Sequence, residues 1–144
     1  MTLTLLLASL LAAGSSAQGP SVSIVILTSS DGKMMRFAAS ESDLANVPTW
    51  RPEEGQAAPL DLKLAIGLGR DFVRKRHPDV QEFDLSSVTL SRLEPPHHDQ
   101  WYYLVKLQPV IGGQALKGGL YFACVLMNGT VLEPQEYTEK SKGE

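Results

Sequence analysis

The chain has 144 residues, with 13 Lys and Arg, 16 Asp and Glu, and a formal net charge of −3. Because nucleic-acid-binding domains need an excess of basic side chains, the sequence predicts no nucleic-acid partner. A single cysteine, Cys124, excludes an internal disulfide. A chain of this size does not need a disulfide for stability, because it buries roughly two-thirds of its unfolded surface on folding.

Residues 1–17 have the pattern of a cleavable signal peptide. Leucines dominate residues 3–11, and no charged side chain precedes Asp31. The apolar run is too short for a bilayer, which takes about 20 residues, but it suits a signal-peptide core. Ser15 and Ala17 are small residues at the positions that a cleavage site requires. We therefore predict an exported protein, secreted or periplasmic, with no membrane contact after cleavage; the alternative is a buried N-terminal strand or helix.

Two strands and an irregular segment follow. Residues 22–28 are rich in β-branched side chains, which predicts a strand, and Asp31-Gly32 is a strong hairpin-turn signal. A returning strand is expected over residues 33–38. Residues 40–59 contain three prolines and no regular apolar spacing, which predicts a long irregular loop.

Residues 60–77 predict the longest element, an amphipathic helix. Apolar and small side chains gather on one side, whereas Lys63 and Arg74 lie on the other. Pro78 ends the helix, and basic residues at its C-terminal end suit the helix dipole. Gly69 lies on the apolar side, which predicts a close approach of helix to sheet. The side that should be buried contains Leu62, Ala65, Ile66, Leu68, Gly69, Phe72 and Val73.

Strands dominate the rest of the chain. We expect them at residues 87–93, 101–107, 120–127 and 130–133, with a long glycine-rich loop over 108–119 and a tight Asn128-Gly129 turn. The sequence thus predicts one α+β domain over residues 18–137, in which one long amphipathic helix packs on a curved, mostly antiparallel sheet of four to five strands. Residues 138–144 are expected to form a flexible charged tail.

The strand expected at residues 120–127 is apolar on both of its faces. A single helix covers only one face of a sheet, so the second face needs another cover. One alternative is that the N-terminal hairpin or residues 40–59 cover it. The other is that it meets a partner protein or a second copy of the chain, since large exposed apolar patches mark interaction sites. The candidate partner surface consists of Tyr121, Ala123, Val125 and Met127.

Side chains with chemical potential do not form a recognisable catalytic pattern. Cys124 lies in an apolar run without a basic neighbour, which favours an inert buried thiol over a nucleophile. Adjacent residues such as His97, His98 and Asp99 rarely converge on one metal ion, so a solvated turn is favoured. The aromatic residues Trp50 and 101–103 are expected in the core rather than in a ligand groove. We predict no catalytic residue, metal or cofactor.

The helix, the aromatic strand Trp101-Tyr102-Tyr103-Leu104-Val105 and the closing Asn128-Gly129-Thr130-Val131-Leu132 resemble the cystatin-like and PepSY-type arrangement. The likeness covers residues 60–132 and implies an exported, non-enzymatic binding domain. Residues 108–112 match the Q-x-V-x-G pattern of cystatin protease inhibitors. That motif comes one strand later here than in the family, and the family's Pro-Trp loop is missing.

Three functions agree with these patterns. The leading hypothesis is an exported, non-catalytic binding module, regulatory or inhibitory, for an unknown ligand. A cone-shaped ligand carrier or enzyme resembling ketosteroid isomerase is the second, and it would need Asp71 or Tyr103 buried in a closed pocket. The third is an assembly component that associates with itself through the second face of the sheet.

Overall fold

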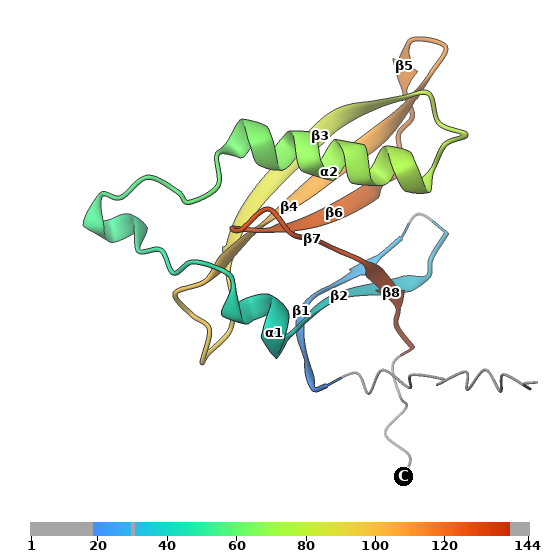
Figure 1. Cartoon of the computed structure of the whole chain (residues 1–144). Helices are drawn as coiled ribbons and strands as arrows, with labels where there is room; N and C mark the ends of the chain where they lie inside the picture. Colours follow the sequence, from blue (N-terminus) through green and yellow to red (C-terminus); the bar gives the residue numbers. More distant parts are fainter. Residues whose placement is uncertain (1–18, 30, 139–144) are drawn as a thin grey trace, which may run out of the picture.

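The computed structural model describes residues 19–29 and 31–138. The predicted α+β class is confirmed: one long and one short helix accompany two antiparallel sheets, of three and five strands, that do not close into a barrel (Figure 1). The predicted signal peptide, residues 1–17, lies outside the described residues. The same holds for residues 139–144 of the predicted tail. Within the described ranges, no helix is long and apolar enough to cross a membrane.

The five-stranded sheet is built from consecutive antiparallel strands. Its order is β3 (Glu82–Arg92), β4 (Trp101–Ile111), β6 (Tyr121–Leu126) and β7 (Val131–Leu132), and β5 (Gln114–Ala115) pairs with the end of β4. The predicted Asn128-Gly129 turn joins β6 and β7, where Leu126 donates its N–H to the Thr130 carbonyl over 2.9 Å.

The expected loop over residues 108–119 is wrong in its first part, where the structure has the end of β4 and strand β5. β4 continues to Ile111, because residues 108–110 pair with the first residues of β3. Gly112 and Gly113 then form a tight turn with φ values of 59° and 78°, which returns the chain into β5. A Gly-Gly pair is a known hairpin signal, since glycine adopts positive φ without strain.

The N-terminal hairpin and the chain's last described strand form the second sheet. β1 (Ser21–Thr28) pairs with β2 (Met34–Ser40), and β2 pairs with β8 (Pro134–Glu136). The chain passes from β7 in one sheet to β8 in the other through the single residue Glu133. Pro134 explains this transfer, because proline has no N–H to continue the ladder with β6.

Helix α2 (Leu62–Arg76) packs on the five-stranded sheet. Its N-cap Asp61 accepts hydrogen bonds from the N–H groups of Lys63 and Leu64, and its last turn is basic. Gly69 faces β4 and β6: a Cβ atom placed there would lie 3.2 Å from side-chain atoms of Val105 and Ala123. The predicted close approach of helix to sheet is therefore confirmed.

Residues 40–59 are more regular than the sequence predicted. They contain a short helix, α1 (Glu41–Ala45), and a 3₁₀ turn over Pro52–Glu54. The signal for α1 was present in the sequence as a capping box: the Ser40 hydroxyl accepts from the Asp43 N–H, and the Asp43 carboxylate accepts from the Ser40 N–H. The irregular-loop prediction thus overlooked one turn of helix.

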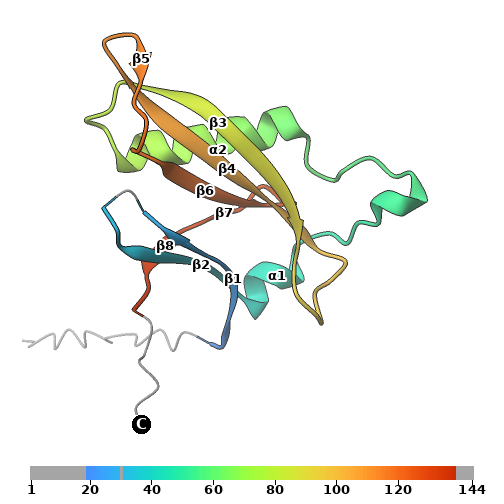
Figure 2. The ribbon, with the colours of Figure 1, turned by 180° about the vertical axis from the view of Figure 1, so that it is seen from behind.

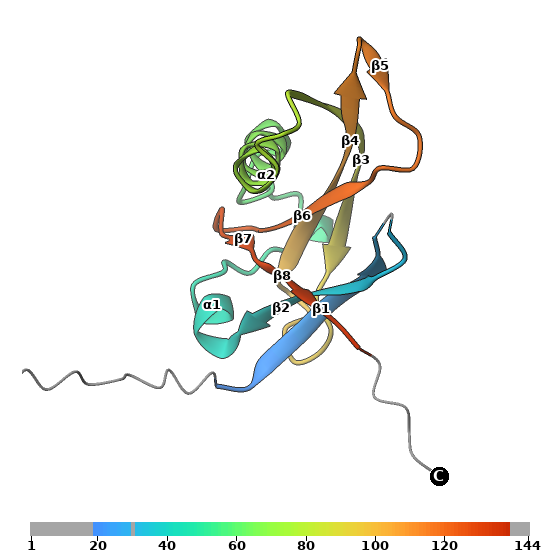
Figure 3. The ribbon, with the colours of Figure 1, turned by 90° about the vertical axis from the view of Figure 1, so that its right-hand side faces the viewer.

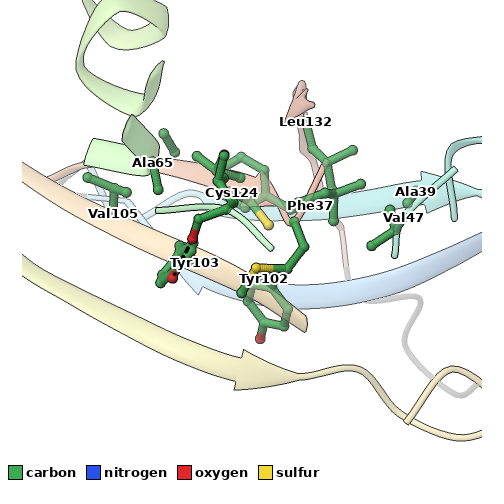
Figure 4. Close-up of a cluster of buried hydrophobic side chains, with 14 of the residues drawn as sticks. Phe37, Ala39, Val47, Ala65, Tyr102, Tyr103, Val105, Cys124 and Leu132 are labelled. Atoms are coloured by element: carbon green, nitrogen blue, oxygen red, sulfur yellow. Dashed lines mark hydrogen bonds between the residues drawn. The ribbon is translucent and has the colours of Figure 1, made fainter. Parts of the chain in front are cut away.

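The elements form three layers, with β6 and β7 between α2 and the three-stranded sheet (Figures 2 and 3). The core continues through all three layers. On the helix side it contains Ala65 and Val105; on the other side Phe37 of β2 lies beside Cys124 and Leu132 (Figure 4). The N-terminal hairpin therefore covers the second face of the sheet. This was one of the two alternatives; the other was a partner protein or a second copy of the chain.

Candidate functional site

The candidate partner surface is buried. Val125 and Ala123 have no exposed area, and Met127 is 2% exposed. Ala123 lies beneath Gly69, so this face of β6 is the one that α2 covers. Tyr121 is half-buried, with its ring centroid 4.4 Å from that of His77 and 5.3 Å from that of Phe83. The prediction of a partner surface at these residues is wrong, because it assigned the helix-covered face to the partner.

The aromatic candidates belong to the core and to a set of contacts around the β3–β4 turn. We call these contacts, which join residues 44–50 to Gln100 and Trp101, the turn contacts. Trp50 and Trp101 meet edge to face with centroids 5.4 Å apart, and the Trp101 indole N–H donates to the Trp50 carbonyl. Buried Gln100 donates its side-chain N–H groups to the carbonyls of Leu44 and Val47, over 2.7 and 2.9 Å. These bonds hold residues 44–50 against the turn. Trp50 also lines a small, mostly polar surface hollow together with Arg51 and Glu54.

Of the turn residues, His98 lies beside Asp99, with its Nε2 3.6 Å from a carboxylate oxygen, while His97 points to another partner. His97 Nε2 lies 3.3 Å from a carboxylate oxygen of Glu41, whereas Asp99 accepts from Arg51 over 3.0 Å. The hydrogen bond from Arg51 holds the pKa of Asp99 below its usual value. Within the described part of the chain, no three His, Cys, Asp or Glu side chains gather as metal ligands would.

Cys124 is fully buried, and burial raises the pKa of its thiol to about 12. The thiol is therefore protonated at neutral pH and unsuited to nucleophilic attack. An isomerase-like pocket would need Asp71 or Tyr103 buried in a closed cavity; Tyr103 is buried, but it lines neither of the described clefts. Asp71 is exposed on α2, and the Tyr103 hydroxyl donates to the Leu60 carbonyl over 3.0 Å.

One cleft stands out among the surface features of the described residues. It lies where the C-terminal turn of α2, the start of β6 and the β2–β8 pair meet, and its volume is about 340 Å³, within the range of small ligand sites. We call it the α2–β8 cleft. Its apolar wall consists of Met34, Met35, Phe72, Val73, Leu120, Tyr121, Phe122 and Pro134, and its polar rim of Ser29, Asp31, Lys33, Arg76, His77 and Glu136.

The charges on the rim of the α2–β8 cleft compensate one another. Lys33 Nζ lies 3.9 Å from Asp31 and 3.8 Å from Glu136, and Arg76 forms an ion pair with Glu133. Burial lowers the pKa of His77, so its imidazole is neutral at pH 7. The cleft thus has an apolar wall and a rim with nearly no net charge, which suits an uncharged or amphipathic occupant rather than a phosphate.

An unpaired length of strand β6 borders this cleft. The hairpin bond at Leu126 sets the alternation, so that the backbone groups of Cys124 and Phe122 point toward the β7 side. Cys124 pairs with Leu132, but the next partner in that register is Pro134, which pairs with Phe37 of β2 instead. None of the described strands therefore pairs with Phe122 on its cleft side.

Sequence reasoning missed this cleft because four separate segments line it. One signal was available: Pro134 directly follows the strand expected at residues 130–133, so the ladder to β6 has to end there. The partner of β8, however, is β2, and cross-strand neighbours such as Arg36 and Gln135 are 99 residues apart in the chain.

Comparison with protein-family models, with curated proteins and with solved structures finds no match to this chain. The resemblance to cystatin-like and PepSY-type domains therefore stays a prediction. The Q-x-V-x-G match at Gln108 falls on the end of β4 and the β4–β5 turn.

Proposed function

We propose that this protein is an exported, non-catalytic binding module that holds a short extended peptide, with uncharged and apolar side chains, in the α2–β8 cleft. The observation that carries the proposal is the unpaired backbone of β6 at Phe122, beside an apolar wall and a neutral rim. Peptides that add a strand to a sheet obtain affinity from main-chain hydrogen bonds and specificity from side-chain pockets. A regulatory or inhibitory role would follow from the peptide that is bound.

The composition of the wall supports a peptide with apolar side chains. Met34 and Met35 line one side, and methionine adapts its shape to different occupants because it is unbranched and flexible. Phe72 of α2 and Phe122 of β6 add flat apolar area to the wall. Since Lys33 and Arg76 already have acidic partners, a charged peptide would gain little at the rim.

The arrangement of titratable groups supports binding rather than catalysis. Among the described residues, the Cys124 thiol is buried and protonated, and His77 is packed against the Tyr121 ring with no acidic side chain hydrogen-bonded to it. Activated nucleophiles and general bases instead stand within hydrogen-bond reach of each other. The implied likeness to cystatin-like domains points the same way.

Export is supported by the sequence pattern of residues 1–17. Cleavage after Ala17 would leave β1, which begins at Ser21, inside the mature chain, so the domain would lose no described element. Expression of the full chain in a bacterial host, followed by fractionation and N-terminal sequencing, tests this part. A mature N-terminus at Gln18 in an extracytoplasmic fraction is expected, and an intact chain in the cytoplasm would contradict it.

Peptide binding is tested by fluorescence anisotropy with a labelled, end-capped peptide of alternating valine and threonine. Met34→Asp and Leu120→Asp each place a charge in the lining of the cleft, from different segments of the chain, and both side chains lie outside the core cluster. Each should weaken binding at least about tenfold, which corresponds to roughly 1.4 kcal/mol. Leu116→Asp changes a 43% exposed leucine outside the cleft and should leave affinity unchanged. Absence of binding to the parent protein, or equal loss in all three variants, would contradict the proposal.

A further inference from the structure

The outer edge of the five-stranded sheet is strand β3, which pairs with β4 on one side only. A β-bulge interrupts that pairing between Leu85 and Ser87, and from Ser87 to Arg92 the register is regular. Sheet edges are normally protected by lysine, proline, bulges or covering segments, because unpaired backbone groups recruit other strands. Residues 87–91 are Ser, Val, Thr, Leu and Ser, so this half of the edge has no such protection in its sequence.

The backbone groups that face outward can be identified from the hydrogen bonds. Leu93 donates its N–H to the Gln100 carbonyl, so Ser91, Thr89 and Ser87 also bond toward β4. Val88 and Leu90 therefore direct their N–H and C=O groups away from the sheet. Their side chains lie on the α2 side, opposite Val105 and Tyr103, and Leu90 remains 40% exposed. Helix α2 lies over β4 and β6 (Figure 3), and Val88 and Leu90 are not among the buried residues.

We infer that β3 is a self-association surface, at which a second copy of this chain pairs its own β3 in antiparallel orientation about a two-fold axis at Thr89. In this register Val88 meets the partner's Leu90, and Leu90 meets the partner's Val88. Thr89 faces Thr89 of the second copy, and Ser87 faces the partner's Ser91. Apolar pairs meet on one face and small hydroxyls on the other, and both kinds of cross-strand pair are favourable.

Electrostatics agree with a second copy as the occupant. No charged residue occurs in residues 87–91, so no like charges meet within the paired segment. Arg92, at the end of the segment, would face the partner's Ser86 and already lies over the Trp101 ring, 4.8 Å from its centroid. The edge strand of the three-stranded sheet, β1, is less suitable because a bulge between Ser23 and Val25 divides it near its middle.

The contact is short. Stable interfaces bury about 1,200–2,000 Å² in total, and five paired residues a side bury less. The dimer should therefore form reversibly, with a mass in sedimentation equilibrium that rises with concentration. This inference does not depend on the α2–β8 cleft, which lies on other strands.

Cysteine cross-linking tests the register. Two residues that face each other in a non-hydrogen-bonded pair have Cα atoms about 4.5 Å apart, within the range of a disulfide. Thr89→Cys, oxidised by glutathione disulfide, should therefore give a covalent dimer on non-reducing electrophoresis. Ser91→Cys is the matched control, because Ser91 faces the partner's Ser87 rather than its own copy. The native Cys124 is buried and common to both variants. Equal cross-linking in the two variants would overturn the inferred register.

Charge substitution tests the surface without a covalent bond. Thr89→Lys and Thr89→Glu should each be monomeric, because like charges meet at the axis, while an equimolar mixture should regain the dimer. Ile26→Lys changes β1 at a side chain that is 42% exposed and should leave association intact. A parent protein that stays monomeric at millimolar concentration would overturn the inference, as would a dimer that is lost only in Ile26→Lys. Circular dichroism confirms that each variant is folded.

Discussion

Gly69 of α2 lies against Val105 of β4 so closely that a Cβ atom on residue 69 would stand 3.2 Å from the Val105 Cβ. Ala123 of β6 would be equally near. Both neighbouring atoms are attached directly to strand backbones, so they cannot move aside without shifting the sheet. The glycine therefore sets the distance between the helix layer and the sheet layer.

Gly69→Ala should destabilise the protein although alanine favours helices. The substitution gains about 1 kcal/mol in helix propensity, but overpacking a core costs about 1–3 kcal/mol. We expect a net decrease of the free energy of unfolding on the order of 1 kcal/mol, measured by urea denaturation. Gly67→Ala is the control on the same helix, because a Cβ there meets nothing within 4 Å, and it should stabilise. Stabilisation by both variants would show that the sheet yields to α2.

Cys124 should be unreactive in the folded protein. Its thiol is fully buried and burial raises its pKa to about 12, so the thiolate is scarce at neutral pH. Ellman's reagent should label the chain in denaturant and leave the native protein unlabelled over the same period. Rapid labelling of native protein at one equivalent would contradict the described burial and reopen a nucleophilic role.

Gln100 should stabilise residues 41–50 locally. Gln100→Leu removes the donors to the Leu44 and Val47 carbonyls, and each buried acceptor that loses its partner costs about 1–3 kcal/mol. Hydrogen exchange measured by mass spectrometry should become faster in α1 and the following loop, with β6 unaffected. Gln114→Leu, at an exposed position on β5, is the matched control and should leave exchange unchanged. Unchanged exchange in Gln100→Leu would contradict the stabilisation of residues 41–50 by the turn contacts.

Local signals predicted much of this fold. The Asn128-Gly129 turn and the β-branched residues of β1 depend on neighbours in sequence, and both were found where expected. The apolar periodicity located α2 and its buried residues Ala65, Gly69 and Val73, but it was wrong for Leu62, which is 49% exposed. Strand ends were less accurate: β3 begins at Glu82 rather than at residue 87, because its start is held by pairing with Val110. Residues 82–85 do alternate polar and apolar side chains, which is a strand pattern, but the run is short.

The site could not be predicted because it depends on which sheet β8 joins. The apolar pattern of β6 predicted correctly that both faces are covered, but it does not show which face meets α2. That choice follows from Gly69 lying over Ala123, a contact between residues of separate elements. The α2–β8 cleft likewise exists only because Pro134 leaves β6 and pairs with Phe37.

His77 should make the stability of the protein depend on pH. Burial at the end of α2 lowers its pKa below the ordinary 6.5, and the Tyr121 ring lies beside it. As the pH falls below about 6.5, the unfolded chain takes up a proton at this residue before the folded chain does, so stability decreases until the folded imidazole is also protonated. Above that range His77 is neutral in both states and has no such effect.

Urea unfolding at about pH 7 and about pH 5 measures this difference. His77→Gln should lose less stability between the two pH values than the parent protein. His98→Gln is the control, because His98 has a 56% exposed side chain, and it should retain the parent's dependence. Asp31 and Asp99, whose pKa values hydrogen bonds hold below 3.8, lose their contributions only at lower pH and do not interfere. If His98→Gln alone flattens the pH dependence, the turn and not the α2–β8 cleft contains the sensitive histidine.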